Sequence, residues 1–352
     1  MLQPLRDLFD ESAPNLKARL VAIYSVLGLL NVGAWIWALV AFRDRPALLL
    51  IALTIYGFGL RHAVDADHIA AIDNVTRKLM QLRLRPVSVG FFFAMGHSTV
   101  VVIAAGAVAA TATLLGRFGA FKQYGALIGT SVSALFLLAI AAMNIAIFIS
   151  VFKAYRQIRA GGRYVEQDVD LLLDNRGFLS RIFRPVFKLV TRSWHMYPLG
   201  FLFGLGFDTA TEVAMVGVSA AQAAKGVPFS AILVFPVLFA AGMSLVDTTD
   251  GVMMLGAYDW AFVKPMRKLF YNMTITAVSV VVALVVGGIE ALGLLSDQLG
   301  LKGGAWDVIG MLNDNFNNIG FAIIGLFAAA WAMAFLIYKA KRLDEVETVS
   351  AS

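Results

Sequence analysis

The sequence predicts an all-α integral membrane protein that crosses the bilayer with eight transmembrane helices. Of its 352 residues, 59% are hydrophobic and only 15% are charged, whereas about 25% of the residues in an ordinary soluble domain carry a charge. The mean hydropathy is +0.77. Apolar runs of about 20 residues, the length that a helix needs to cross the hydrocarbon layer, recur along the chain. Because these runs are long and lack the alternation of outer-membrane strands, helices are expected rather than a β-barrel.

The apolar runs divide the chain into two halves around one polar segment. We expect an N-terminal membrane half at 1–152, a cytoplasmic connector at 153–195 and a C-terminal membrane half at 196–352. The predicted spans, in chain order, lie near residues 20–42, 47–72, 87–115, 125–152, 196–222, 228–256, 271–295 and 319–338.

The first predicted span is expected to remain in the protein. The residues before it include Asp7, Asp10 and Glu11 and show no short apolar core followed by a small-residue cleavage site, so we expect no secretory signal. The chain contains no cysteine, which excludes disulfides and thiolate metal sites.

The distribution of basic residues predicts how the spans are oriented. Of the 29 lysines and arginines, 22 fall in the segments on one side of the predicted spans, six on the other side, and Arg61 lies within a span. The positive-inside rule therefore places both termini in the cytoplasm, with an even number of spans. This arrangement explains the net charge of +6 without nucleic-acid binding.

The second span, near 47–72, carries the most unusual stretch, GLRHAVDADHIAAIDNV at 59–75. Each ionisable residue in a bilayer costs about 2.5 to 3.5 kcal/mol on insertion scales, so His62, Asp65, Asp67 and His68 need a compensating role. At about 100° per helical residue, His62, Asp65 and His68 fall within an arc of roughly 120°, and Asp67 points elsewhere unless the helix is broken. Two imidazoles and a carboxylate suit a divalent transition-metal ion, whereas magnesium or calcium would use oxygen ligands only.

Polar residues occur at a similar depth in three other spans. They are His97 and Ser98 in the third span, Asp208, Thr209, Thr211 and Glu212 in the fifth, and Asp247, Thr248, Thr249 and Asp250 in the sixth. We expect some to bind the ion and others to orient an imidazole through its second nitrogen. For the threonines and Ser98, hydrogen bonds between helices are the favoured interpretation.

The other polar residues of these spans have more ordinary interpretations. Arg61 is expected to neutralise an aspartate or to extend toward the membrane surface. Asp73 and Asn74 lie at the predicted cytoplasmic end of the second span and are interpreted as helix caps, with ion release as an alternative role for Asp73. Glu290 in the seventh span and NDNFNN at 313–318, before the eighth, fit either an outer vestibule or loop and cap positions.

Two segments of the chain are similar to each other. FAMGHSTV at 93–100 matches FAAGMSLV at 239–246 at five of eight positions, and GLRHAVDADHIA at 59–70 is related, with a one-residue gap, to GLGFDTATEVA at 204–214. The second and third spans therefore correspond to the fifth and sixth. Because the displacement is three spans, the two units are expected to be inverted, as in many secondary transporters.

The polar stretches resemble the four motifs of the nickel/cobalt transporter family. They are RHAVDADHIAAIDN at 61–74, GHSTVV at 96–101, LGFDTATE at 205–212 and GMSLVDTTDG at 242–251. The resemblance implies an eight-helix permease of the bacterial inner membrane that imports Ni²⁺ or Co²⁺, with no cofactor besides the transported ion. It also implies that His97 influences ion choice, that His62, Asp65, Asp67 and His68 are required for transport, and that the pathway includes Asp208, Glu212, Asp247 and Asp250.

The leading hypothesis is a secondary importer in which His62, Asp65 and His68 bind the dehydrated ion. Related nickel/cobalt exporters carry a histidine-rich cytoplasmic loop, whereas the segment 153–195 contains only His195, so import is favoured. The sequence shows no phosphate-binding Gly-Lys motif for ATP. A proton-coupled exporter of organic cations or amino acids is an alternative; an intramembrane metalloenzyme is less favoured because no HExxH motif is present. Ligand types do not distinguish nickel from cobalt.

Overall fold

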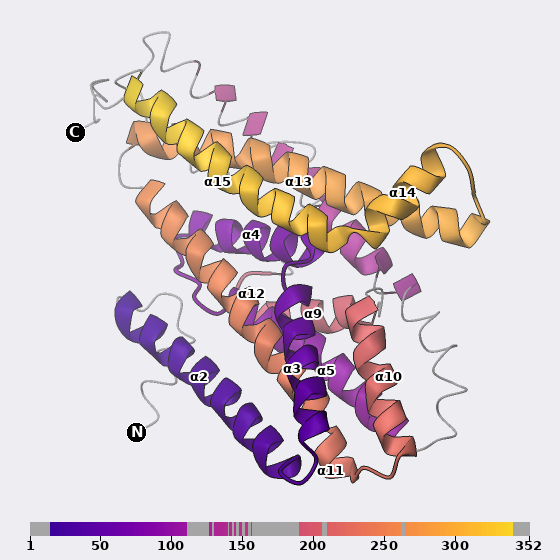
Figure 1. The fold of residues 1–352 in the computed structure, drawn as a ribbon. Helices are drawn as coiled ribbons and strands as arrows, with labels where there is room; N and C mark the ends of the chain where they lie inside the picture. The colour runs from indigo at the N-terminus through magenta and orange to yellow at the C-terminus, as the bar shows by residue number, and fades with distance from the viewer. Residues whose placement is uncertain are drawn as a thin grey trace.

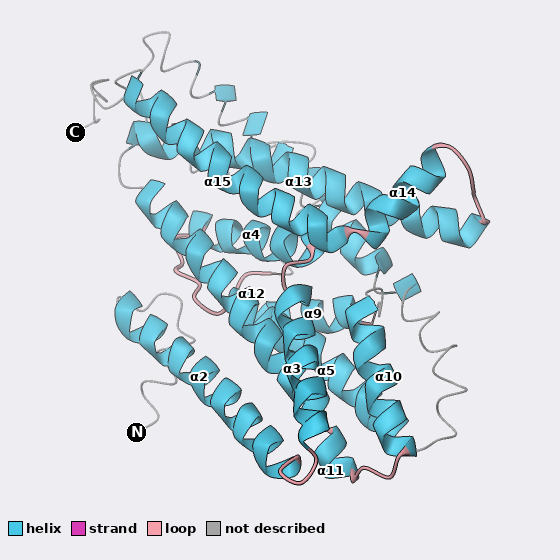
Figure 2. Cartoon of the chain, viewed as in Figure 1, coloured by secondary structure: helices cyan, strands magenta, loops and turns pink. Residues whose placement is uncertain are grey.

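The computed structural model describes residues 15–110, 190–205, 210–261 and 265–340, together with scattered positions between 127 and 156. Every regular element in these residues is a helix, as Figure 2 shows, which confirms the predicted all-α class. The site candidates Asp208 and Thr209, part of the predicted fourth span and most of the connector lie outside the described residues.

The described helices follow the predicted runs closely in the N-terminal half and more loosely in the C-terminal half. The longer helices of Figure 1 are α2 (Leu16–Ala41), α3 (Pro46–His62), α4 (Ala66–Gln81), α5 (Val89–Ala110), α10 (Ala210–Ala224), α12 (Val234–Ala261), α13 (Pro265–Leu299) and α15 (Phe316–Ala340). The shorter helices are η2 (Ser193–His195), α9 (Met196–Gly204), α11 (Phe229–Ile232) and α14 (Ala305–Asp314).

Four of the described helical segments are long and apolar enough to cross a membrane. They are Leu16–Ala41, Val89–Ala110, Phe229–Tyr258 and Met273–Leu299. Two bent pairs, α3 with α4 and α14 with α15, raise this number to six if each pair counts as one span. The described residues thus contain four to six candidate spans.

The predicted second span is not one continuous helix. The chain bends by 52° between α3 and α4, because Ala63 and Val64 leave the helix and Asp65 adopts an extended conformation, with φ −64° and ψ 147°, as the N-cap of α4. The predicted arc of His62, Asp65 and His68 assumed a continuous helix, and this assumption is therefore wrong; the alternative of a broken helix is the one observed.

Helix α4 is polar and yet almost completely buried. Every residue from His68 to Met80 is buried, including Asp73, Asn74, Arg77 and Lys78. The helix is covered by α5, α12, α13 and α15, which enclose its polar face. In Figure 1, α4, α13 and α15 lie across one end of the bundle formed by α3, α5, α10 and α12.

Glycines allow two pairs of helices to approach closely in the bundle. Where α3 crosses α12, a methyl group on Gly59 would overlap the carbonyl of Phe239, and one on Gly242 would lie 2.8 Å from the carbonyl oxygen of Tyr56. Such packing leaves no room for a larger residue, and it fixes α3 firmly against α12.

The crossing of α5 and α9 has the same construction. A methyl group on Gly200 would overlap the carbonyl of Phe93, and one on Gly96 would overlap the carbonyl of Tyr197. Each crossing therefore joins a Tyr-x-x-Gly helix to a Phe-x-x-Gly helix through reciprocal contacts. The break between α3 and α4 lies between these crossings and the layer of α4, α13 and α15 (Figure 1).

Candidate metal site

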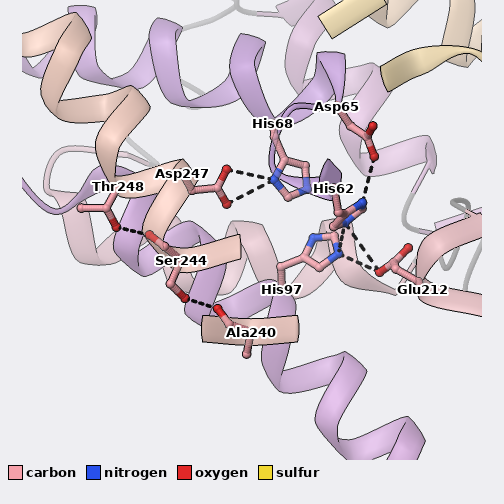
Figure 3. A network of polar contacts seen from close by, with 9 residues as sticks. All are labelled: His62, Asp65, His68, His97, Glu212, Ala240, Ser244, Asp247 and Thr248. Carbon is pink, nitrogen blue, oxygen red and sulfur yellow. Dashed lines mark hydrogen bonds and ion pairs between the residues drawn. The ribbon is translucent and has the colours of Figure 1, made fainter. Parts of the chain in front are cut away.

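Three buried histidines from three helices meet at the break. His62 ends α3, His68 lies in the first turn of α4, and His97 lies in the middle of α5. Nitrogen atoms from the three rings lie within 4.8 Å of one another. Figure 3 shows the three side chains pointing toward one another. The ring centroids are 4.7 Å apart for His62 and His68 and 4.8 Å apart for His62 and His97.

The break explains why two of these histidines face each other. Backbone hydrogen bonds from Val64 N to Arg61 O and from Asp65 N to His62 O close a turn at the end of α3. The chain then restarts in a new direction, so the first turn of α4 carries His68 back toward His62. A straight helix would have placed these two side chains about nine Å apart along its axis, at 1.5 Å per residue.

Each histidine is hydrogen-bonded to a buried carboxylate. Asp65 Oδ2 lies 2.8 Å from His62 Nδ1, and the carboxylate oxygens of Asp247 lie 3.2 and 3.3 Å from His68 Nδ1. Glu212 Oε1 lies 2.8 Å from His97 Nε2 and 3.9 Å from His62 Nε2. Asp247 and Glu212 are fully buried and Asp65 is 5% exposed.

These contacts determine which nitrogens are available as ligands. A carboxylate only accepts hydrogen bonds, so His62 and His68 carry a proton on Nδ1 and present the lone pair of Nε2. His68 Nε2 is buried and has no hydrogen-bond partner among the described residues. His62 Nε2 lies 3.0 Å from His97 Nε2.

The charges around the histidines favour a cation. Asp65, Glu212 and Asp247 contact the imidazoles directly, and burying carboxylates without compensation is costly. A divalent cation among the three rings would neutralise two of these charges. Lone pairs on the nitrogens and carboxylates oriented behind them are the features of a transition-metal site.

The structure brings six predicted site residues together, namely His62, Asp65, His68, His97, Glu212 and Asp247. Ser98 is buried directly after His97, and its hydroxyl has no hydrogen-bond partner in the described part of the chain. Asp67 is half-buried in the first turn of α4, beside His68.

The remaining described candidates lie at the edge of this cluster. Thr248 donates a hydrogen bond of 2.6 Å to the carbonyl of Ser244 in its own helix, rather than to a neighbouring helix as the sequence interpretation expected. Thr211 is half-buried in α10, and Arg61 is exposed in the last turn of α3. Asp250 lies one turn beyond Asp247, and its buried Oδ2 atom has no hydrogen-bond partner among the described residues.

The interpretation of Asp73 and Asn74 as terminal caps is wrong, because α4 continues to Gln81 and both side chains are buried in its middle. Asp73 accepts hydrogen bonds from the hydroxyls of Tyr258 and Ser279. These partners were missed by sequence reasoning, although polar groups in apolar runs are a signal of such bonds.

Asn74 belongs to a second set of buried contacts. Its Oδ1 atom accepts hydrogen bonds from Arg77, at 3.1 Å, and from Asn144, at 2.7 Å. Arg77 also donates to Thr276, at 3.0 Å. These bonds tie α4 to α13 and to the helical segment around Asn144.

Comparisons with known proteins find nickel and cobalt transport proteins. The profile of the NicO family, described as a high-affinity nickel-transport protein, matches residues 48–337. The high-affinity nickel transport protein of Cupriavidus necator is 57% identical over 348 residues, which are 99% of each chain. The hydrogenase nickel incorporation protein HupN of Bradyrhizobium diazoefficiens is 55% identical over 88% of this chain and 81% of its own. The cobalt transport protein NhlF of Rhodococcus rhodochrous is 41% identical over 80% of each chain.

No solved structure matches the chain. The family profile extends from α3 to α15 and so includes every helix that contributes to the histidine cluster. With its apolar helices, the chain is a multi-pass membrane protein. It belongs to the NicO family of high-affinity nickel-transport proteins.

Proposed function

We propose that this chain is a secondary transporter that imports Ni²⁺, and Co²⁺ as a related substrate, across the cytoplasmic membrane of a bacterium. The observation that carries the proposal is the meeting of His62, His68 and His97, all buried, at a break within a membrane span. The names of the relatives, which include nickel and cobalt transport proteins, support both ions.

The ion is bound by the Nε2 atoms of His62, His68 and His97 and by Glu212. In the ion-free protein His97 Nε2 donates its proton to Glu212, and this proton is released when the ion binds. Two donors that bind a metal at about 2.1 Å and at right angles lie about 3 Å apart, and His62 Nε2 lies 3.0 Å from His97 Nε2. A right angle is the geometry of tetragonal or octahedral ions, which include Ni²⁺. Before the ion binds, the proton on His97 Nε2 is also shared with His62 Nε2, which removes the repulsion between these two nitrogens.

Asp65 and Asp247 orient the imidazoles. Each accepts a hydrogen bond from Nδ1 of a histidine, which fixes the tautomer, turns the ring toward the ion and raises the basicity of Nε2. In this assignment Asp65 is a partner of His62, rather than the ligand that the helical arc suggested. Asp67, being half-buried beside the cluster, adds negative charge that attracts the cation.

The membrane topology is the predicted one, with eight spans and both termini in the cytoplasm. The bent pair α3–α4 is the second span, and α9 with α10 forms the fifth. In this orientation α4 and α12 both run from the histidine cluster toward the cytoplasm. Basic residues follow both helices, at Arg83 and Arg85 and at Lys264 and Arg267, as the positive-inside rule requires.

The two halves form an inverted repeat, in which α3, α4 and α5 correspond to α9, α10 and α12. The reciprocal crossings support this correspondence, because Tyr56 and Gly59 make the contacts in one crossing that Tyr197 and Gly200 make in the other. The crossings pair Gly59 with Gly200, whereas the sequence match pairs Gly59 with Gly204. The two alignments therefore differ by four residues, about one helical turn. A site between such repeats is opened to each side in turn as one repeat moves against the other.

The membrane potential drives import. Moving a divalent cation inward releases about 4.6 kcal/mol per 100 mV, at about 2.3 kcal/mol per charge. No ATP is needed for accumulation in this scheme.

Uptake of radiolabelled nickel into vesicles tests the proposal. Full-length protein should take up nickel, and His62→Ala should reduce uptake to the background of empty vesicles, because one of three imidazoles is lost. His195→Ala is the matched control, since His195 is the only one of the four histidines outside the cluster. Equal uptake by wild type and His62→Ala would refute the proposal. Efflux of nickel from vesicles preloaded with nickel, against a potential that is negative inside, would favour an exporter.

A further inference from the structure

A glycine outside the four polar motifs contacts the break that forms the site. Gly320 is buried in the second turn of α15. A methyl group on it would overlap the carbonyl oxygen of Val64 and lie 3.3 Å from Ile69 Cδ1. Val64 lies two residues after His62, which ends α3, and directly before Asp65, the N-cap of α4.

The contact is on the backbone of the break itself. Ala63 and Val64 lie outside both helices. Their backbone is held by the hydrogen bonds of the turn at the end of α3 and by the elements packed against it. Helix α15 is one such neighbour, and it packs along α4 as well. In Figure 1 the start of α15 lies beside the end of α3.

A displacement of Val64 would move the two histidines unequally. Helix α3 is fixed to α12 through Gly59 and Gly242, so His62 would keep its position. The first turn of α4 has no such glycine crossing among the described residues; it is held to α12 through the hydrogen bond of His68 to Asp247, and it would shift with the break. His68, whose free Nε2 atom faces the cluster, would therefore move away from His62.

We infer that Gly320 is a positioning residue for the metal site, through which α15 sets the distance between His62 and His68. The inference rests on the proposed function, because it assigns a role in binding the transported ion. Only glycine lets α15 approach the Val64 carbonyl closely enough to hold α4 in its observed place. The last helix thereby belongs to the ion-binding machinery without contributing a ligand.

The test compares three alanine variants of the purified full-length protein. Gly320→Ala should raise the Kd for Ni²⁺, added as NiCl₂, by about tenfold or more, the usual effect of losing a partner that orients a ligand. X-ray absorption at the nickel edge should show one fewer imidazole. Gly325→Ala, on the same helix with open space around its α-carbon, should change neither quantity.

A third variant separates positioning from loss of stability. In Gly287→Ala the new methyl group would lie 3.1 Å from Leu137 Cβ, in a tight contact of α13 away from the histidines. It should lower the unfolding temperature and leave the imidazole count unchanged. The inference is overturned if Gly320→Ala binds nickel like wild type, or if Gly287→Ala weakens binding equally. Failure of the wild type to bind nickel would instead overturn the proposed function.

Amide hydrogen exchange on the wild type gives a second measurement that does not depend on folding of a variant. Addition of NiCl₂ should slow exchange around 63–69 and also in the first turns of α15, around 318–323. Protection of the break without any change in α15 would contradict the inference.

Discussion

His68 combines two kinds of contact in one side chain. Its Nδ1 atom donates to Asp247 on α12, and its Nε2 atom remains without a partner in the histidine cluster. The aspartate therefore fixes which nitrogen is free and where it points. Its negative charge also raises the basicity of the ring, which strengthens a bond from Nε2 to a metal ion.

Asp247→Asn should weaken nickel binding by about 10- to 100-fold. The amide oxygen still accepts the hydrogen bond from His68, but the charge that strengthens the imidazole as a ligand is lost. Isothermal titration of the purified protein with NiCl₂ measures the effect. Asp307→Asn is the control, because Asp307 lies in α14 at the exposed side of the molecule; a similar loss there would show that the effect is not local.

The sequence predicted most of the residues that lie together in the cluster, and the role of each of them stays a prediction. The residue types and the cost of burying charge identified His62, His68, His97, Glu212 and Asp247. The assignment of Asp65 as a ligand came from a helical arc, and that arc does not exist where the helix is broken. The hydrogen bonds of Asp73 could not be predicted, because Tyr258 and Ser279 are more than 180 residues away.

The break between α3 and α4 had a local signal that periodicity obscured. Aspartate is a preferred N-cap residue, and Asp65 followed by Ala66, Asp67 and His68 is a possible helix start within an apolar run. The apolar residues near 47–72 form one run that includes α3 and the start of α4, so the hydropathy pattern predicted a single span. In the structure, α12 packs closely on α3 and α15 on Val64, and such tertiary contacts are not visible in the local sequence.

At the scale of elements, the glycine crossings give a test of helix packing. Gly200→Ala should destabilise the protein by about 1 to 3 kcal/mol, the usual cost of overpacking, because the new methyl group overlaps the Phe93 carbonyl. The unfolding temperature in detergent measures this. Gly33→Ala on α2, where nothing lies within 4 Å of the added carbon, should be neutral or slightly stabilising, since alanine favours helix. Equal effects of the two substitutions would argue against the observed crossing.

The whole molecule is organised by charge as well as by packing. The composition predicted the membrane class and the all-α fold, since the physics of the bilayer allows few alternatives. It could not give the number of spans unambiguously, because α4 is polar and α14 with α15 bends by 81°. The proposed repeat rests in the sequence only on short matches. The reciprocal crossings add support from backbone contacts, which a comparison of side-chain identities does not record.

Single cysteines test the topology of the whole chain, which has none of its own. Lys302→Cys and Arg43→Cys should react with a membrane-impermeant thiol reagent in intact cells, and Arg85→Cys should react only after the membrane is opened. All three positions are exposed and lie in loops between predicted spans. Labelling of Arg85→Cys in intact cells would contradict the cytoplasmic orientation of the end of α4.

The burial of α4 bears on how the protein is made. The side chains of Asp73, Asn74 and Arg77 in this helix are buried by other helices. The covering helices α12, α13 and α15 follow it in the chain and so emerge from the ribosome later. The segment therefore cannot reach its final environment while the first half alone is in the membrane, since a polar helix partitions poorly into lipid. Biogenesis must hold this segment at the membrane surface or against the translocon until the later helices arrive to enclose it.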